Sequence, residues 1–492
     1  MRLETATLPH LGATVATPGY DRRQVRVGIA HIGVGGFHRS HQAMYVDRLM
    51  EMGEALDWGI CGIGLMPADL AMHRALSAQD GLYTLMTKDS AGRASARVVG
   101  SIVCHLYAPE DPEAVLAVLS DPMTRVVSLT VTEGGYNIDA TTGKFDANNP
   151  AIRAEAVPGA APSSMFGYLA EALRRRRRSG AGPFTVMSCD NVQSNGATTR
   201  DCLLAFAALH DPGLADWIEA EVAFPNSMVD RITPVTAQAD IDRLRDELGV
   251  EDLWPVVCEP FTQWVLEDNF VAGRPPLERA GVQLTRDVEP YELMKLRLLN
   301  AGHQAIAYHG RLAGYTYAHE AATDPVFVEF LVGYMNCEAR PTLEAVPDVD
   351  LDEYVRTLVS RFGNPYILDT IARLCAFSSD RVPKWVLPVV RSNLASGGGV
   401  ERAVAIVASW ARYCEGIDED GRPIEVEDHL RDELMARAAE QSHDPLAFVR
   451  DDKLFGGLAD DPHFAKAYVA ALGSLHQLGA RRSLEALNAA LA

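Results

Sequence analysis

The segment 25–52 restricts the fold most, because a strand, a glycine turn and a helix follow one another directly in it. Residues 25–32 (VRVGIAHI) are apolar and β-branched enough to form a buried parallel strand. Gly33, Gly35 and Gly36 then form a turn, and a helical pattern follows. This order is typical of the first unit of a dinucleotide-binding fold, where glycines let the backbone bend tightly and approach a pyrophosphate.

The glycine turn matches the pattern GxGxxG only in part. His38 stands where the third glycine is expected. Its loss indicates either a helix displaced slightly from the sheet, or His38 and Arg39 side chains turned toward the phosphates. On the motif alone, a dinucleotide site and a plain glycine-rich turn are both open.

The acidic residue that normally follows about 20 positions later is not at the end of the next predicted strand, 58–63. The nearest candidate is Asp69, a few residues further on. Asp69 either binds the adenosine ribose hydroxyls and favours NAD over NADP, or caps the helix that follows.

Strand and helix patterns, with strands at 83–88 and 96–107 among them, alternate through the first 285 residues and then give way to helices. Alternation indicates a mainly parallel sheet covered on both faces. From residue 291 onward, long helical patterns, among them 351–361 and 463–489, are separated by short turns. We therefore predict an α/β domain of the Rossmann type at 1–285 and a mostly α-helical domain at 286–492.

Two of the predicted strands end in polar, glycine-containing turns. The strand at 125–131 runs into TEGGY at 132–136, and the strand at 184–188 runs into Cys189-Asp190-Asn191. Ligands of open α/β sheets collect at the carboxyl ends of the strands. We expect both turns to border the ligand site.

The segment 291–310 (YELMKLRLLNAGHQAIAYHG) is predicted to be a buried helix with a polar stripe. At about 100° per residue from Lys295, Glu292 falls near 60°, His303 near 80° and Asn300 near 140°. One interpretation is an amphipathic helix whose stripe meets water. The other is an acid–base site, because desolvation lowers the pKa of a lysine toward neutrality.

Composition excludes several classes of partner. With 45 basic and 66 acidic residues, the formal charge of −21 repels nucleic acids and anionic membrane surfaces. The five consecutive arginines at 174–178 are expected to be a solvated helix C-terminus. No apolar run approaches the roughly 20 residues of a membrane span, and the N-terminus lacks a signal-peptide pattern.

The eight cysteines are scattered without a CxxC pair, which predicts reduced, mostly buried thiols and no zinc site of the cysteine-cluster type. The expected location is cytoplasmic.

Four motifs together resemble the mannitol dehydrogenase family, the polyol-specific long-chain dehydrogenases. They are HIGVGGFHRSHQ at 31–42, TEGGY at 132–136, SCDNVQSNG at 188–196, and the spacing Lys295-x4-Asn300-x2-His303. The resemblance covers nearly the whole chain, and it implies that the domain at 1–285 binds the dinucleotide and that the domain at 286–492 is the substrate and catalytic domain. In this family a histidine at the position of His38 is part of the usual turn.

The resemblance implies metal-independent hydride transfer between a secondary alcohol of a sugar alcohol and NAD. Lys295 resembles the general base of the family. Asn300 and Asn191 resemble the two amides that hold the alcohol or ketone oxygen, and His303 resembles a substrate-positioning residue. Glu292 is either a proton relay or a partner in a surface ion pair.

Further residues are assigned by the same resemblance. Asp230 and Arg373 resemble substrate-site positions. The expected cofactor contacts are Gly33, Gly35, Gly36, Phe37, His38, Asp69, Glu133 and Gly134. The predicted reaction is oxidation of D-mannitol to D-fructose. The alternatives are a fructuronate or tagaturonate reductase, a D-arabinitol dehydrogenase, or an NAD-binding sensor without turnover.

Overall fold

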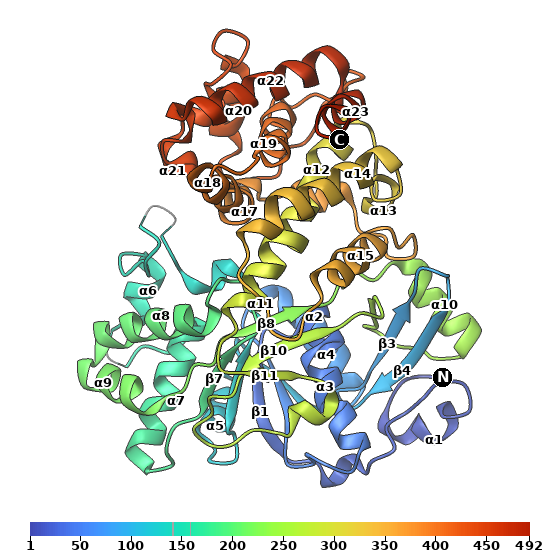
Figure 1. The fold of residues 1–492 in the computed structure, drawn as a ribbon. Coiled ribbons are helices and arrows are strands. Elements are labelled where there is room, and N and C mark those ends of the chain that lie inside the picture. Colours follow the sequence, from blue (N-terminus) through green and yellow to red (C-terminus); the bar gives the residue numbers. More distant parts are fainter. Residues whose placement is uncertain (140–141, 158) are drawn as a thin grey trace. The chain divides into compact units, whose positions relative to one another are not determined.

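A computed structural model describes residues 1–139, 142–157 and 159–492, and its contacts divide the chain into two compact units (Figure 1). The first unit is Met1–Val288 and the second is Glu289–Ala492. The sequence patterns placed the domain boundary between residues 285 and 286.

A five-stranded parallel sheet forms the centre of the first unit, as predicted for a Rossmann-type domain. Its strand order is β5-β2-β1-β6-β7, with every neighbouring pair parallel. The strands are β1 (Val27–Ile32), β2 (Gly59–Gly64), β5 (Ile102–Tyr107), β6 (Val126–Leu129) and β7 (Thr185–Ser188).

Apolar clusters cover both faces of this sheet. Consecutive side chains of a strand point to opposite sides, so neighbouring residues of β1 belong to different clusters. Ile29 of β1 packs into a cluster with Tyr45 of α3. The next residue, Ala30, belongs to a second cluster with Leu169 of α7. The helices of this unit are α1 (Leu8–Leu11), α2 (Gly36–Ser40), α3 (Gln42–Glu51), α4 (Leu70–Ala78), α5 (Pro112–Ser120), α6 (Pro150–Glu155), α7 (Met165–Ser179), α8 (Asn195–His210), α9 (Pro212–Glu221) and α10 (Gln238–Leu248).

Two three-stranded sheets complete the first unit. One has the order β4-β3-β9 and the other β11-β10-β8. Their strands are β3 (Tyr83–Lys88), β4 (Ala94–Val99), β8 (Ser227–Asp230), β9 (Val256–Cys258), β10 (Gln263–Glu267) and β11 (Gln283–Thr285). The strand material predicted at 96–107 is therefore two strands in different sheets. They separate at Gly100, whose N–H donates to the buried Asp47 carboxylate at 2.9 Å.

The second unit is helical, as predicted. Its α-helices are α11 (Glu289–Met294), α12 (Ala301–Leu312), α13 (Ala318–Ala321), α14 (Pro325–Gly333), α15 (Leu351–Phe362), α16 (Ile371–Cys375), α17 (Ser378–Trp385), α18 (Leu387–Ser396), α19 (Glu401–Tyr413), α20 (Arg431–Glu440), α21 (Asp452–Phe455), α22 (Pro462–Leu478) and α23 (Ala480–Ala490). Two π-helical turns, Lys295–Asn300 and Tyr334–Ala339, interrupt the α-helical winding. No helix in the described parts of the chain is long and apolar enough to cross a membrane.

The expectation that the arginine run is solvated is wrong for Arg176, which is buried. Its guanidinium donates to the carbonyl oxygens of Asp121 and Thr124 at 2.8 and 2.9 Å. The five donors of an arginine can be satisfied by backbone carbonyls at a chain reversal. Arg176 thus fixes the connection between α5 and β6.

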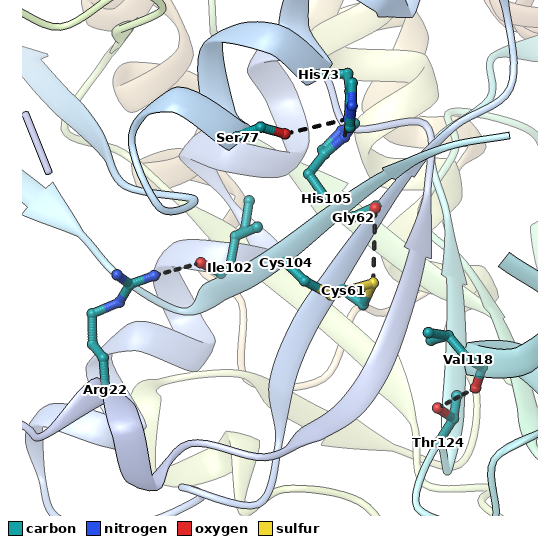
Figure 2. The surroundings of a disulfide bond; sticks show 10 residues. All are labelled: Arg22, Cys61, Gly62, His73, Ser77, Ile102, Cys104, His105, Val118 and Thr124. Atoms are coloured by element: carbon teal, nitrogen blue, oxygen red, sulfur yellow. Dashed lines mark hydrogen bonds between the residues drawn. A yellow bond between two sulfur atoms is a disulfide. The ribbon is translucent and has the colours of Figure 1, made fainter. Parts of the chain in front are cut away.

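The expectation of reduced thiols is wrong for Cys61 and Cys104, which form a disulfide (Figure 2). The two cysteines are partners in the register of β2 and β5, with Cα atoms 4.8 Å apart. Strand register brings them together, and their separation of 43 residues in the sequence gave no indication of it.

Candidate functional site

The glycine turn after β1 lies at the point where the strand order reverses. The chain continues from β1 to β2 on one side, whereas β6 lies on the other. Gly33 has φ +92°, and a Cβ there would lie 2.1 Å from the carbonyl oxygen of Thr130, so the backbone conformation and the contact both require glycine. Switch points of this kind are the usual ligand sites of open α/β sheets.

The outer side of this turn is open and fits a dinucleotide phosphate. A Cβ on Gly35 would meet only the Gly33 carbonyl oxygen, at 3.9 Å, and a Cβ on Gly134 would meet nothing within 4 Å. Glu133 and Gly134 lie in the exposed turn after β6, the strand next to β1. Backbone exposed at neighbouring strand ends lets a pyrophosphate approach closely.

The side chains of His38 and Arg39 do not face this open side. His38 is 1 % exposed and stacks on His31, with ring centroids 3.4 Å apart. Burial lowers the pKa of His38 well below its usual value, so the ring is neutral. Arg39 is buried and donates to the carbonyl oxygen of Trp254. The interpretation in which both side chains turn toward the phosphates is wrong. His38 could then contact the cofactor only through its backbone.

Asp69 lies against the carboxyl end of β2. Its Oδ2 accepts a hydrogen bond from the Met66 N–H at 2.8 Å, and a Cβ on Gly64 would lie 2.6 Å from the Asp69 Cβ. The carboxylate makes no capping bond to α4. Its bond to the Met66 N–H caps the 3₁₀ turn Pro67–Asp69 that leads into α4, which supports the capping interpretation, and a contact with the adenosine ribose stays a prediction.

Asp190 and Asn195 organise the edge beyond β6 and β7. The Asp190 carboxylate accepts hydrogen bonds from the Thr132 N–H at 2.7 Å and from the Tyr136 hydroxyl at 2.8 Å. The Asn195 amide donates to the Asp190 carbonyl at 3.0 Å and the Ser227 carbonyl at 2.8 Å. These bonds connect the TEGGY turn, the end of β7 and the start of β8.

The predicted residues Asn191 and Asp230 lie in the segments that this network holds. Asn191 is exposed, just after β7, and Asp230 is buried at the end of β8. Thr132 and Ser194 have φ values of +62° and +49°, which are unusual for residues other than glycine and cluster at functional sites. Asp190 and Asn195 were not singled out from the sequence, although both lie inside the motif SCDNVQSNG.

In the second unit, Lys295 and Asn300 occupy the first and last positions of a π turn. The N–H of Ala301 donates to the carbonyl of Leu296, five residues earlier. Because π winding bonds residues five apart, Lys295 and Asn300 lie nearly above one another. The angle of 140° between them, which assumed α winding, is wrong for this reason.

The polar stripe of this helix is largely buried. The exposed fractions are 9 % for Glu292 and Lys295 and 5 % for Asn300. His303 is half-buried, and its ring stacks on Phe362 with centroids 4.1 Å apart. The interpretation of a stripe that meets water is therefore wrong.

Arg373 is positioned on α16 by a two-point ion pair with Asp369. Nε and Nη2 each lie 2.5 Å from a carboxylate oxygen, and half of the side chain is exposed. The planar fork of the guanidinium is thereby held in one orientation. Within the described residues, no group of three or more His, Cys, Asp or Glu side chains could hold a metal ion.

Comparisons with known proteins agree along the whole chain. Residues 27–279 match the model of the mannitol dehydrogenase Rossmann domain, and residues 287–476 match that of the mannitol dehydrogenase C-terminal domain. The chain is 45% identical over 480 residues to a mannitol 2-dehydrogenase of Neosartorya fischeri, covering 96% of this chain and 95% of the relative.

Two solved structures are similar over nearly the full length. One is a Pseudomonas fluorescens mannitol 2-dehydrogenase in ternary complex with NAD and D-mannitol, with a TM-score of 0.92, 45% identity and coverage of 99% of both chains. The other is a D-sorbitol dehydrogenase in substrate-free form, with a TM-score of 0.89 and 38% identity, covering 98% of this chain and 100% of that one.

Proposed function

Because the chain belongs to the mannitol dehydrogenase family and is an NAD-dependent polyol dehydrogenase, we propose that it interconverts D-mannitol and D-fructose. The observation that carries the proposal is the full-length likeness, at 45% identity, to an enzyme whose complex contains NAD and D-mannitol. The buried Lys295 and Asn300 in one π turn give this likeness a chemical basis.

We propose Lys295 as the general base. NAD, when bound, supplies the hydride acceptor. The carbinol hydroxyl must lose its proton as the hydride leaves, and the Lys295 amine takes that proton. A lysine that is 9 % exposed suits this role, because desolvation disfavours its charged form. The proposed mechanism needs no metal ion.

Two amides are proposed to stabilise the oxygen on which negative charge develops. Asn300 in the second unit and Asn191 in the first each donate an N–H to it. Asp230, Arg373 and His303 are proposed to bind the other hydroxyls of the polyol. Glu292, one turn before Lys295, is proposed to pass the released proton on.

The direct test is NAD and NADP reduction with D-mannitol, D-arabinitol and D-sorbitol measured side by side. We expect D-mannitol with NAD to give the highest kcat/KM, because Asp69 disfavours the 2′-phosphate of NADP. D-sorbitol is the second candidate, favoured by the likeness to a D-sorbitol dehydrogenase. If the chain reduced fructuronate or tagaturonate with NADH faster than it turned over any of these polyols, it would be a uronate reductase. If it turned over none of these substrates, a sensor would be favoured.

The base is tested by Lys295→Ala, with Lys466→Ala, at an exposed position of α22, as the control. Lys295→Ala should abolish turnover and leave NADH binding, followed by nicotinamide fluorescence, nearly unchanged. Near wild-type turnover in this variant would show that Lys295 is not the base.

A further inference from the structure

A buried carboxylate, that of Asp190, holds both ends of the turn that follows β6. Asp190 is 6 % exposed. One of its carboxylate oxygens accepts from the Thr132 N–H at 2.7 Å, and the other accepts from the Tyr136 hydroxyl at 2.8 Å. Thr132 precedes the 3₁₀ turn Glu133–Tyr136, and Tyr136 ends it. The two bonds therefore hold this turn from both sides, and the expected cofactor contacts lie exposed between them.

The backbone at Thr132 needs to be held in this way. Its φ is +62° and its ψ is 171°, a conformation that is rare for residues other than glycine. Such a conformation costs free energy and persists only where the surrounding structure holds it. The Thr132 N–H is bonded to Asp190, and the Tyr136 hydroxyl, which is bonded to the same carboxylate, also lies 2.6 Å from Ser188 Oγ. The shape of the turn therefore depends on Asp190.

The backbone of the same residue leads directly into Asn191. The Asp190 N–H donates to Ser188 Oγ at 3.3 Å, and the Asp190 carbonyl oxygen accepts from the Asn195 amide at 3.0 Å. Asn195 is 1 % exposed and also donates to the Ser227 carbonyl of β8 at 2.8 Å. The peptide unit before Asn191 is thereby fixed against β7 and β8, so the Asn191 side chain extends from a fixed backbone.

We propose that Asp190 is a positioning residue of the dehydrogenase, which fixes the cofactor turn and the Asn191 amide relative to each other. Its side chain shapes the turn, and its backbone leads into the amide, so one residue couples the two placements. Hydride transfer needs this coupling, because reacting groups that are displaced by about 1 Å react much more slowly. The inference rests on the proposed function, in which Asn191 donates to the reacting oxygen.

A matched pair of bonds lies at the opposite edge of the same sheet. The buried Asp47 carboxylate accepts from the Tyr20 hydroxyl at 2.7 Å and from the Gly100 N–H at 2.9 Å, just before β5 begins. Asp47 thus makes the same two kinds of bond as Asp190, but away from the carboxyl ends of the strands. Tyr20→Phe is therefore the control for Tyr136→Phe.

NADH binding to the full-length protein without polyol, followed by nicotinamide fluorescence, tests the placement of the cofactor turn. Tyr136→Phe should weaken binding about fivefold, the scale of one net hydrogen bond, and Asp190→Leu roughly 20-fold or more, the scale of two. Asp190→Asn should bind NADH nearly as the wild type does. Its amide oxygen still accepts from the Thr132 N–H, and its amide nitrogen can donate to the Tyr136 hydroxyl oxygen. Tyr20→Phe should leave NADH affinity unchanged.

Steady-state kinetics at saturating NAD tests the placement of the amide. In Tyr136→Phe and Asp190→Leu, kcat should fall while KM for the polyol stays near that of the wild type, because a misplaced amide weakens binding of the transition state alone. Circular dichroism selects a temperature at which every variant is folded, so a change in stability does not enter either value. If Asn191→Ala lowers kcat and these two variants do not, the inference about Asp190 fails by itself. If Asn191→Ala leaves kcat unchanged, the proposed role of that amide fails.

The outcomes of the two measurements decide the proposal together. Wild-type NADH affinity or wild-type kcat in both Tyr136→Phe and Asp190→Leu would overturn it. An equal loss of NADH affinity in Tyr20→Phe would also overturn it, and so would a loss in Asp190→Asn as large as in Asp190→Leu. If Asp190→Leu does not fold, Tyr136→Phe and Asp190→Asn decide by the same criteria.

Discussion

Asn300 and Asn191 are ordinary amides whose proposed role depends on where charge develops during the reaction. If each donates to the reacting oxygen, Asn300→Ala and Asn191→Ala should each lower kcat by about 10²–10³-fold, the scale of one oxyanion donor. Steady-state kinetics with the preferred polyol measures this. Asn148→Ala, in an exposed segment, is the control. An effect on KM alone would remove either amide from the proposed role.

The individual residues of the candidate site were predictable where a motif carried them. Lys295, Asn300 and His303 could be singled out because they share one face of an otherwise apolar helix, and Asn191 because the motif SCDNVQSNG resembles that of the family. The inward orientation of His38 could not, because it depends on stacking against His31. The organising bonds of Asp190 and Asn195 depend on β7 and β8 meeting in space, which sequence spacing does not show.

The β1–α2 turn is the element that depends most strictly on one residue. A Cβ on Gly33 would lie 2.1 Å from the Thr130 carbonyl oxygen, so Gly33→Ala must displace the turn from β6. We expect NADH affinity to fall at least tenfold and stability to fall by about 2 kcal/mol or more, since clash and positive φ act together.

Gly249→Ala separates the effect of the clash from the effect of the positive φ. Gly249 also has positive φ, +69°, but a Cβ there would meet nothing within 4 Å. The free energy of unfolding of this variant should fall by only about 1 kcal/mol, the cost of the backbone conformation. Urea denaturation and NADH fluorescence measure both variants, and equal losses of stability and affinity in the two would contradict the account of the turn.

The second π turn, Tyr334–Ala339, contains Glu338, and the buried carboxyl group of this residue lies against the start of α19. Glu338 accepts hydrogen bonds from the N–H groups of Arg402 and Ala403 at 2.8 and 2.7 Å. Burial nevertheless raises its pKa from 4.5 to about 7. A raised carboxyl pKa means that the folded state holds the proton more tightly, so stability is lost as pH rises from 4.5 to 7.

Glu338→Gln should remove this pH dependence. Between pH 4.5 and pH 8 the free energy of unfolding of the variant, relative to wild type, should rise by on the order of 3 kcal/mol. Denaturant titrations at the two pH values measure it, with the exposed Glu344→Gln as the control. A relative change of the opposite sign would show that the capping bonds outweigh burial.

Elements with a regular period were predictable and irregular ones were not. The strand at 83–88 and the helix near 351–361 follow directly from their patterns. The helix expected at 463–489 is broken at Gly479, which has φ +79°. The π turns were not predicted, because a hydrophobic pattern evaluated at 3.6 residues per turn does not register one wider turn.

At the scale of the molecule, the cofactor turn and the proposed base belong to different units. The first unit has its own buried clusters on both faces of the sheet. A fragment of residues 1–288 should therefore fold, as judged by circular dichroism, and bind NADH. It should show no polyol-dependent turnover, because Lys295 and Asn300 are missing. A folded fragment that fails to bind NADH would place essential cofactor contacts in the second unit.

The strand and helix patterns predicted an α/β part followed by a helical part. They did not predict the disulfide between Cys61 and Cys104, which needs the register of β2 and β5.

The π turn at Lys295–Asn300 also decides what a change of chain length would do there. A π turn holds one residue more than the α winding it replaces, so deleting one residue of it would restore α winding and leave the helix on either side close to its present orientation. Glu292 and His303 would then keep nearly their present directions relative to each other. The extra residue therefore widens this turn locally without changing the register of the helix on either side of it.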